Sequence, residues 1–166
     1  IVPERVCGAD IVPLNELRYV SFALYKQALA KYNGRESLIK EYIPLLNCFW
    51  GDVVFLTAVQ PEGLQKAYAE AGGTLRKRNF YQIQLGNLDR SRMAAMRQGI
   101  VNGQPVHTFA RFDPRDMPYY ASIPTDTVEY YRKELGAGRR PLIFHMIPQI
   151  LYRGSFSVLD LCAVEL

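Results

Sequence analysis

One stretch constrains the fold of this chain more than any other: residues 47–63, NCFWGDVVFLTAVQPEG. Residues 52–59 are almost all apolar, β-branched or aromatic, which predicts a strand covered on both faces. Pro61 follows at once and suits the first position of a helix, where its missing N–H costs nothing. That helix is predicted to run to about Ala71 and to end at Gly72 and Gly73. The stretch therefore indicates a fold that combines strands with helices.

The other elements are predicted from hydrophobic periodicity and from turn residues. Strands are expected over residues 17–20, 79–85, 105–112, 141–152 (bent at Pro148) and 155–161, with a loop over 113–118. Helices are expected over residues 21–32, 36–46 (interrupted at Pro44), 87–98 or 89–98, and 125–135. The sequence therefore predicts an α+β fold, with a mixed sheet of about six strands and four or five helices. We expect one globular domain over residues 1–166, with an irregular lead-in over residues 1–13.

Composition limits the classes of protein to which the chain can belong. Its 166 residues, 49% apolar and 22% charged, can bury a core without disulfides or metal. No apolar run approaches the roughly 20 residues of a membrane helix, so no membrane partner is expected. The three cysteines show no CxxC spacing, which favours reduced thiols and a cytoplasmic setting, with delivery into another cell left open. With two histidines besides, no metal site is expected. The first residue is not Met, which favours a fragment or a processed product.

The distribution of charge points to an anionic partner. Arginine outnumbers lysine by 14 to 6, and residues 71–140 hold 12 basic side chains against 6 acidic ones. Arginine binds phosphate and carboxylate groups with two parallel hydrogen bonds, whereas lysine acts as a point charge. The middle of the chain therefore favours a nucleotide, another phosphate-bearing ligand or an acidic protein, although a solvated basic surface accounts for the same charges.

Several catalytic motifs are missing from the sequence. It contains no GxGxxG, GxxxxGK[ST], HExxH or GxSxG pattern, so phosphate-loop, zincin and hydrolase-elbow chemistry have no support. A cysteine–histidine pair drawn from Cys48, Cys162, His107 and His145 stays open. The apolar neighbours of both cysteines favour structural thiols over nucleophiles.

Three segments resemble successive units of one protein family. They are LRYVSFALYKQALAKYNG (residues 17–34), WGDVVFLTAVQPEGLQKAYAEAG (50–72) and RNFYQIQL (78–85). Together they resemble ADP-ribosyltransferase toxin-like domains, in which a first strand bears Arg or His, and a later strand ends in Leu-Thr before a helix. The chain differs from the His–Tyr–acid group of that family at Arg18 and Phe55. An arginine in the first strand is typical of the branch that uses Arg, Ser or Thr, and Glu.

This resemblance implies an NAD-dependent ADP-ribosyltransferase of the effector or toxin type, with NAD as its substrate. Arg18 would contact the phosphates or ribose of NAD, and Thr57 would support the site. Glu165 would be the late catalytic acid, with Asp160 and Glu129 as alternatives. A fixed carboxylate suits this chemistry because positive charge develops as the nicotinamide–ribose bond breaks.

The same resemblance implies a set of residues that bind the dinucleotide. Arg18 would hold the pyrophosphate, because a guanidinium can donate two hydrogen bonds to it. Tyr19, Phe55 and Tyr81 would stack on the nicotinamide or adenine ring, and Tyr119 and Tyr120 are also available for this role.

A second hypothesis is a non-catalytic binding module. Basic and aromatic residues alternate in RKRNFYQIQ (residues 76–84), HTFARFDPRDMPYY (107–120) and EYYRKELGAGRRP (129–141). Such segments suit single-stranded nucleic acid, and equally a protein interface rich in Tyr and Arg. A third hypothesis is an acid–base enzyme that uses His107, Asp113 and Asp116, but carboxylates beside prolines are typical of turns.

Overall fold

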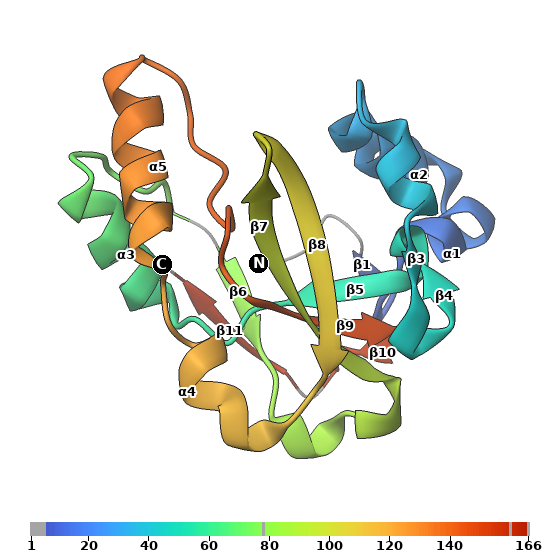
Figure 1. Ribbon diagram of the computed structural model, residues 1–166. Helices are drawn as coiled ribbons and strands as arrows, with labels where there is room; N and C mark the ends of the chain where they lie inside the picture. The colour runs from blue at the N-terminus through green and yellow to red at the C-terminus, as the bar shows by residue number, and fades with distance from the viewer. Residues whose placement is uncertain (1–5, 78, 160, 166) are drawn as a thin grey trace. The chain divides into compact units, whose positions relative to one another are not determined.

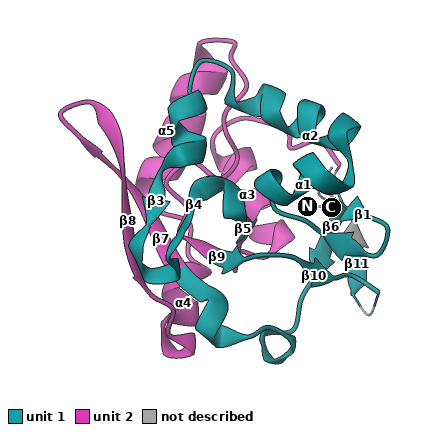
Figure 2. Ribbon diagram, turned by 90° about the vertical axis from the view of Figure 1, so that its right-hand side faces the viewer, with its two compact units in different colours: residues 1–55, 78–94, 151–165 teal, residues 56–77, 95–150, 166 magenta. Residues whose placement is uncertain are grey.

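The computed structural model describes residues 6–77, 79–159 and 161–165 (Figure 1). For residues 164 and 165 it describes the backbone but not the side chains. The fold is α+β, as predicted, with helices and antiparallel strand pairs. The chain divides into two compact units, each of which is described by itself (Figure 2). Unit 1 comprises residues 1–55, 78–94 and 151–165, and unit 2 comprises residues 56–77 and 95–150. One domain over residues 1–166 stays a prediction.

The helices and strands have the following bounds. The helices are α1 (Leu14–Val20), α2 (Phe22–Leu29), α3 (Pro61–Glu70), α4 (Met117–Tyr120) and α5 (Thr125–Gly136). The strands are β1 (Val6–Cys7), β2 (Asp10–Ile11), β3 (Tyr42–Ile43), β4 (Cys48–Phe49), β5 (Val53–Leu56), β6 (Asn79–Gln82), β7 (Met93–Val101), β8 (Gln104–Arg111), β9 (Gln149–Arg153), β10 (Phe156–Ser157) and β11 (Cys162–Glu165). They form sheets in the orders β1-β2-β10, β11-β6, β3-β4 and β5-β9-β7-β8.

The strand predicted over residues 17–20 is wrong, because these residues belong to helix α1. Leu14 and Leu17 are fully buried, and their spacing of three residues places both side chains on one helical face. Ser21 then leaves the helical conformation and caps α2, where its hydroxyl accepts a hydrogen bond from the Leu24 N–H at 3.5 Å. The helix predicted over residues 21–32 is confirmed as α2 followed by a 3₁₀ turn.

The segment of residues 47–63 folds largely as predicted. Trp50 donates from Nε1 to the Tyr32 hydroxyl at 3.2 Å, and its ring lies 4.7 Å from that of Phe55. The predicted strand is confirmed as β5 but is shorter, because the Thr57 hydroxyl accepts a hydrogen bond from the Val59 N–H at 3.2 Å and turns the chain. Helix α3 begins at Pro61, as predicted.

Two predicted helices are wrong. Residues 36–46 form 3₁₀ turns on either side of β3, and Pro44 and Asn47 (φ 47°) turn the chain into β4. Residues 87–98 form 3₁₀ turns and the first part of β7. Met93–Met96 are good helix formers, yet all four are buried, and burial on both faces of a sheet outweighs helix propensity there.

Three smaller corrections concern strands and loops. Only Gln149–Arg153 of the predicted strand 141–152 is a strand, and only Phe156–Ser157 of the strand predicted over 155–161. The expected lead-in contains the short strands β1 and β2, while residues 1–5 lie outside the described residues. The expected loop over 113–118 contains a 3₁₀ turn and the start of α4.

In unit 2, helices α3 and α5 enclose a small core. Ala67, Tyr68 and Ala71 of α3 pack with Tyr131 of α5, whose ring lies 5.2 Å from that of Tyr68. Gly73 allows this close approach, because a Cβ there would lie 2.7 Å from the Leu135 side chain and from the Tyr68 ring. No helix in the described ranges is both long enough and apolar enough to cross a membrane.

Helix α5 also fixes the segment that precedes β9. The buried Tyr131 hydroxyl donates a hydrogen bond to the Ile143 carbonyl, and the buried Thr127 hydroxyl donates to the His145 carbonyl at 2.9 Å. Burial raises the pKa of Tyr131 well above its usual value, so the hydroxyl stays protonated and remains a donor. Residues 143–145 are therefore held against α5 by two side chains one helical turn apart.

We predict that Tyr131→Phe lowers the free energy of unfolding by about 1–3 kcal/mol, because it leaves the buried Ile143 carbonyl without a donor. Tyr130→Phe is the matched control, since the Tyr130 hydroxyl accepts an exposed hydrogen bond from the Leu142 N–H at 3.2 Å. Its cost should be smaller. Urea unfolding followed by circular dichroism measures both, and equal costs for the two variants would contradict the role given to the buried hydroxyl.

Candidate functional site

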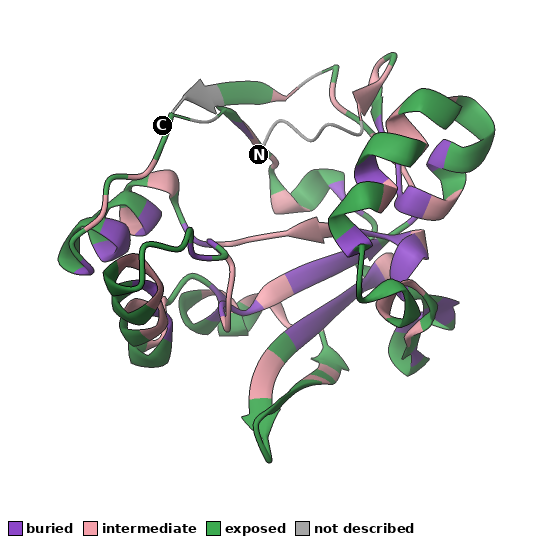
Figure 3. Ribbon diagram, turned by 90° about the horizontal axis from the view of Figure 1, so that it is seen from above, coloured by how far each residue is buried: buried purple, intermediate pink, exposed green. Residues whose placement is uncertain are grey.

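The hairpin of β7 and β8 provides the frame of the candidate site. Asn102 and Gly103 connect the strands with φ of 52° and 75°, as in a type I′ turn. A two-residue turn places Val101 opposite Gln104, so counting along the strands brings Arg97 opposite Thr108 and Gly99 opposite Val106. Burial falls along the hairpin, from buried residues at the start of β7 to exposed residues at the turn (Figure 3).

One face of this hairpin borders a cavity of about 360 Å³, which we call the hairpin hollow. The hairpin lines it with Arg97, Gly99, Val101, Val106 and Thr108, which the turn places on one face, and also with Gln98 from between Arg97 and Gly99. Gly99 lies in the middle of this face, and a Cβ there would meet no atom within 4 Å. The absence of a side chain at residue 99 therefore keeps the middle of the face open.

The other walls of the hairpin hollow come from Tyr119 on α4, Pro124 and Met146. The Arg97 guanidinium lies over the Tyr119 ring, 4.1 Å from its centroid. Tyr119 is 41% exposed, and within the described residues no carboxylate forms an ion pair with Arg97. A guanidinium stacked on an aromatic ring keeps its N–H edge available for an anion.

Met146 is held in a strained conformation at the wall. Its φ is 59°, in the left-handed region that side chains other than glycine seldom adopt. The Met146 N–H donates to the Gln98 side chain at 3.3 Å, which joins this wall to β7. Such strain persists where the surrounding contacts fix the backbone, and it is concentrated at functional sites.

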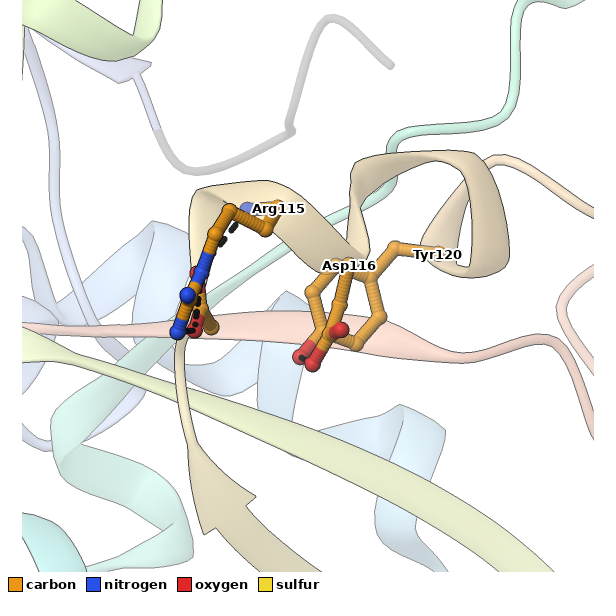
Figure 4. A network of polar contacts seen from close by, with 4 residues as sticks. Arg115, Asp116 and Tyr120 are labelled. Carbon is orange, nitrogen blue, oxygen red and sulfur yellow. Dashed lines mark hydrogen bonds and ion pairs between the residues drawn. The ribbon is translucent and has the colours of Figure 1, made fainter.

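The carboxylates near α4 have structural roles. Asp113 accepts hydrogen bonds from the Arg115 backbone N–H at 2.9 Å and from the Arg115 guanidinium at 2.6 Å. These hydrogen bonds lower the pKa of Asp113 to about 2. The Tyr120 hydroxyl donates to Asp116 at 3.3 Å (Figure 4). These bonds assign both carboxylates to the turn, so they give the acid–base hypothesis no support.

The hairpin hollow is suited to a planar, anionic group. Its volume is near the lower end of ligand pockets, which span about 300–1,000 Å³. Tyr119 offers an aromatic surface, Arg97 offers a charged donor edge, and the Thr108 hydroxyl can donate or accept a hydrogen bond. Val101 and Val106 provide apolar contact at the open end.

Arg18 and Tyr19 lie together on unit 1. Both are on helix α1 rather than on the predicted strand, and the Arg18 guanidinium is 5.9 Å from the Tyr19 ring centroid. Tyr19 is 84% exposed. Phe55 packs on Trp50, and Tyr81 is half-buried in β6 opposite Ala163.

The other residues of the predicted transferase site are placed as follows. Thr57 belongs to unit 2, whereas Arg18 belongs to unit 1, and the Thr57 hydroxyl forms the local turn after β5. Glu165 pairs with Asn79 through its backbone, but its side chain lies outside what the structure describes, as does Asp160. Glu129 is exposed on α5. The catalytic roles of these residues stay predictions.

Cys48 has the properties of a structural thiol. Cys48 is buried, and burial raises the pKa of its thiol to about 11, which disfavours the thiolate. In residues 6–77, 79–159 and 161–163, no group of three or more His, Cys, Asp or Glu side chains could hold a metal ion.

The chain has no match among the known proteins with which it was compared. No model of a protein family matches the chain, and no curated protein or solved structure does so either. The resemblance to transferases therefore depends on the three sequence segments alone. Thr108 and Tyr119 lie in the segment 107–120 that the sequence offered for a binding module, but Arg97, Gly99 and Met146 were not predicted, although Asn102-Gly103 between two β segments is a strong hairpin signal.

We predict a pH dependence from His145, which lies next to Met146. Its ring is 3.8 Å from that of Tyr130, and burial lowers its pKa below the usual 6.5, against the opposing charge of Glu134. As the pH falls, His145 therefore takes up a proton in the unfolded chain before it does so in the folded chain. The free energy of unfolding decreases as the pH drops below about 6.5.

His145→Gln removes this contribution, so the free energy of unfolding of the variant relative to the wild type should rise between pH 7.5 and pH 5.5. Glu134, whose pKa is lowered mainly by its hydrogen bond with Arg139, titrates at lower pH and does not interfere. Urea unfolding at the two pH values measures the effect. A constant difference between variant and wild type would show that His145 has no linkage to folding.

Proposed function

We propose that unit 2 binds a nucleotide in the hairpin hollow, either as a free molecule or as one unit of a single-stranded nucleic acid. The observation that carries this proposal is the stack of Arg97 on Tyr119 at the edge of an open cavity. It develops the hypothesis of a basic, aromatic binding module and gives it a specific site.

The chemistry of a nucleotide matches the groups around the hairpin hollow. A base stacked on an aromatic side chain contributes about 1–3 kcal/mol, and any base can stack in this way. Arg97 can donate two hydrogen bonds to a phosphate while it remains on the Tyr119 ring. Gly99 leaves space for the ligand between these groups and Val106.

The local charge also favours an anion. Residues 95–111 contain Arg97 and Arg111 and no aspartate or glutamate. Binding of a nucleic acid here should therefore weaken as the salt concentration rises, because phosphate contacts release counterions.

We predict that Gly99→Val weakens nucleotide binding, because the valine side chain would occupy the hairpin hollow. The backbone at Gly99 is outside the left-handed region, so a β-branched residue adds no strain there. Gly86→Val is the matched control, since a Cβ at Gly86 also meets no atom within 4 Å. Affinity should fall by about tenfold or more in Gly99→Val and should not change in the control.

Two probes separate the two sources of the nucleotide. Calorimetry with AMP tests a free nucleotide, and fluorescence anisotropy with a labelled oligo-uridine or oligo-thymidine tests a single strand, both at low salt. Arg97→Lys should weaken binding while it keeps the charge, because lysine lacks the planar donor pair. If the wild type binds neither AMP nor the oligonucleotide, the proposal is overturned.

The second candidate is the NAD-dependent ADP-ribosyltransferase that the resemblance implies. The observed order of β5, the Thr57 turn, α3 and β6 supports it, since this is the order of elements in the quoted segments. We expect the chain, given NAD, to release nicotinamide, and Arg18→Lys to reduce the rate. Chromatography of the reaction mixture measures the release, and the absence of both NAD binding and nicotinamide release would exclude this candidate.

A further inference from the structure

We propose that β8 pairs along its free edge with an extended, acidic peptide segment of another protein. In the order β5-β9-β7-β8, strand β8 is last, and β7 is the one strand that pairs with it in the described residues. Strand addition at an open sheet edge is a common mode of peptide recognition, in which backbone hydrogen bonds supply affinity. This proposal does not depend on nucleotide binding.

The turn determines which backbone groups of β8 face this edge. In a two-residue hairpin, the residues that flank the turn exchange hydrogen bonds, and the pattern then alternates along the strands. The N–H and C=O groups of residues 104, 106, 108 and 110 therefore point toward β7. Those of residues 105, 107, 109 and 111 point toward the open edge.

The position of Pro105 agrees with this alternation. Proline lacks an N–H, and it is tolerated in a sheet where that N–H would face away from the neighbouring strand. Pro105 falls on the outward-facing set, so the pairing of β7 with β8 loses no donor. The outward donors on which the proposal rests are the N–H groups of Phe109 and Arg111.

The edge also lacks most of the features that keep edge strands from pairing. Proteins usually protect such strands with lysines, prolines, inward-pointing charges or bulges, or keep them very short, and of these β8 has Pro105 near the turn. β8 is eight residues long, contains no lysine, and has its one arginine, Arg111, at its end. Residues 108–110 therefore form a stretch of the edge without lysine, arginine or proline.

The charges and apolar groups of the hairpin define the partner. Arg97 and Arg111 are exposed, no aspartate or glutamate lies in residues 95–111, and Ile100, Val101 and Val106 are exposed near the turn. An extended segment that alternates acidic and β-branched residues complements both features. A second copy of the chain would instead bring two cationic hairpins together.

The test uses an eight-residue fluorescent peptide in which glutamate alternates with valine and threonine, and the same peptide with lysine in place of glutamate. We expect the full chain to bind the acidic peptide and not the lysine peptide, by fluorescence anisotropy. Phe109→Pro should weaken binding about tenfold relative to Phe109→Val, because both lose the ring but only proline loses the outward N–H. Circular dichroism checks that both variants fold.

A peptide methylated at alternate backbone nitrogens keeps the test decisive if Phe109→Pro does not fold. Methylation of the set that faces β8 should abolish binding, and methylation of the other set should not. Equal binding of the two methylated peptides, equal binding of the lysine peptide, or the absence of binding would overturn the proposal. Self-association of the wild type that excludes the peptide would overturn it in favour of a second copy.

Gly99→Val separates this proposal from the proposed function. It fills the face of the hairpin without altering the outward backbone groups of β8, so we expect peptide binding to persist. Phe109→Pro should in turn leave AMP binding unchanged, since Phe109 does not line the hairpin hollow. Loss of peptide binding in Gly99→Val would show that the peptide binds the face and not the edge.

Discussion

Two buried hydroxyls on α5 hold together the part of the molecule on which the candidate site depends. Thr127 donates to the carbonyl of His145 and Tyr131 to that of Ile143, the two residues that flank Phe144 in the chain. A buried carbonyl without a donor costs about 1–3 kcal/mol, so these bonds hold the segment firmly in place. The next residue, Met146, adopts a left-handed backbone conformation, and the Gln98 side chain accepts a hydrogen bond from its N–H. One wall of the hairpin hollow is thus fixed by a helix that does not itself line it.

The β7–β8 hairpin can support two kinds of contact because its geometry separates them. Side chains alternate between the two faces of a strand, and backbone groups alternate between its two edges. Arg97, Gly99 and Thr108 use one face, whereas Phe109 and Arg111 present backbone donors at the outer edge. A ligand in the hairpin hollow and a peptide strand at the edge therefore contact different residues of the same hairpin.

The sequence predicted those elements whose local signals agree with their environment. Strand β5, helix α3 and helix α5 combine suitable composition with clear start and stop residues, and all three were found. Local signals were misleading at residues 17–20, where aromatic and β-branched residues lie on the exposed side of a helix. They were misleading again at Met93–Met96, where strong helix formers are buried in a sheet. In both segments the deciding factor is which side chains are buried, and that depends on partners far along the chain.

The hairpin hollow could not be predicted for the same reason. Its frame is local, and the Asn102-Gly103 turn could have identified it. Its walls, however, join residues from β7, α4 and the segment before β9, which are separated in the sequence. No periodicity or motif shows that Tyr119 and Met146 will face Arg97.

Two of the arginine–tyrosine contacts in the structure, both at residues considered above for ligand binding, differ in what they imply about function. Arg18 and Tyr19 are neighbours in sequence on an exposed helix, so their 5.9 Å separation needs no further ordering of the chain. Arg97 and Tyr119 come from different elements and lie closer, at 4.1 Å, beside a cavity. Holding two separate segments in register costs conformational entropy, which the remaining contacts of α4 and β7 must offset. An arrangement that is maintained against this cost, and still leaves the guanidinium edge and part of the ring exposed, is the stronger indication of a binding site.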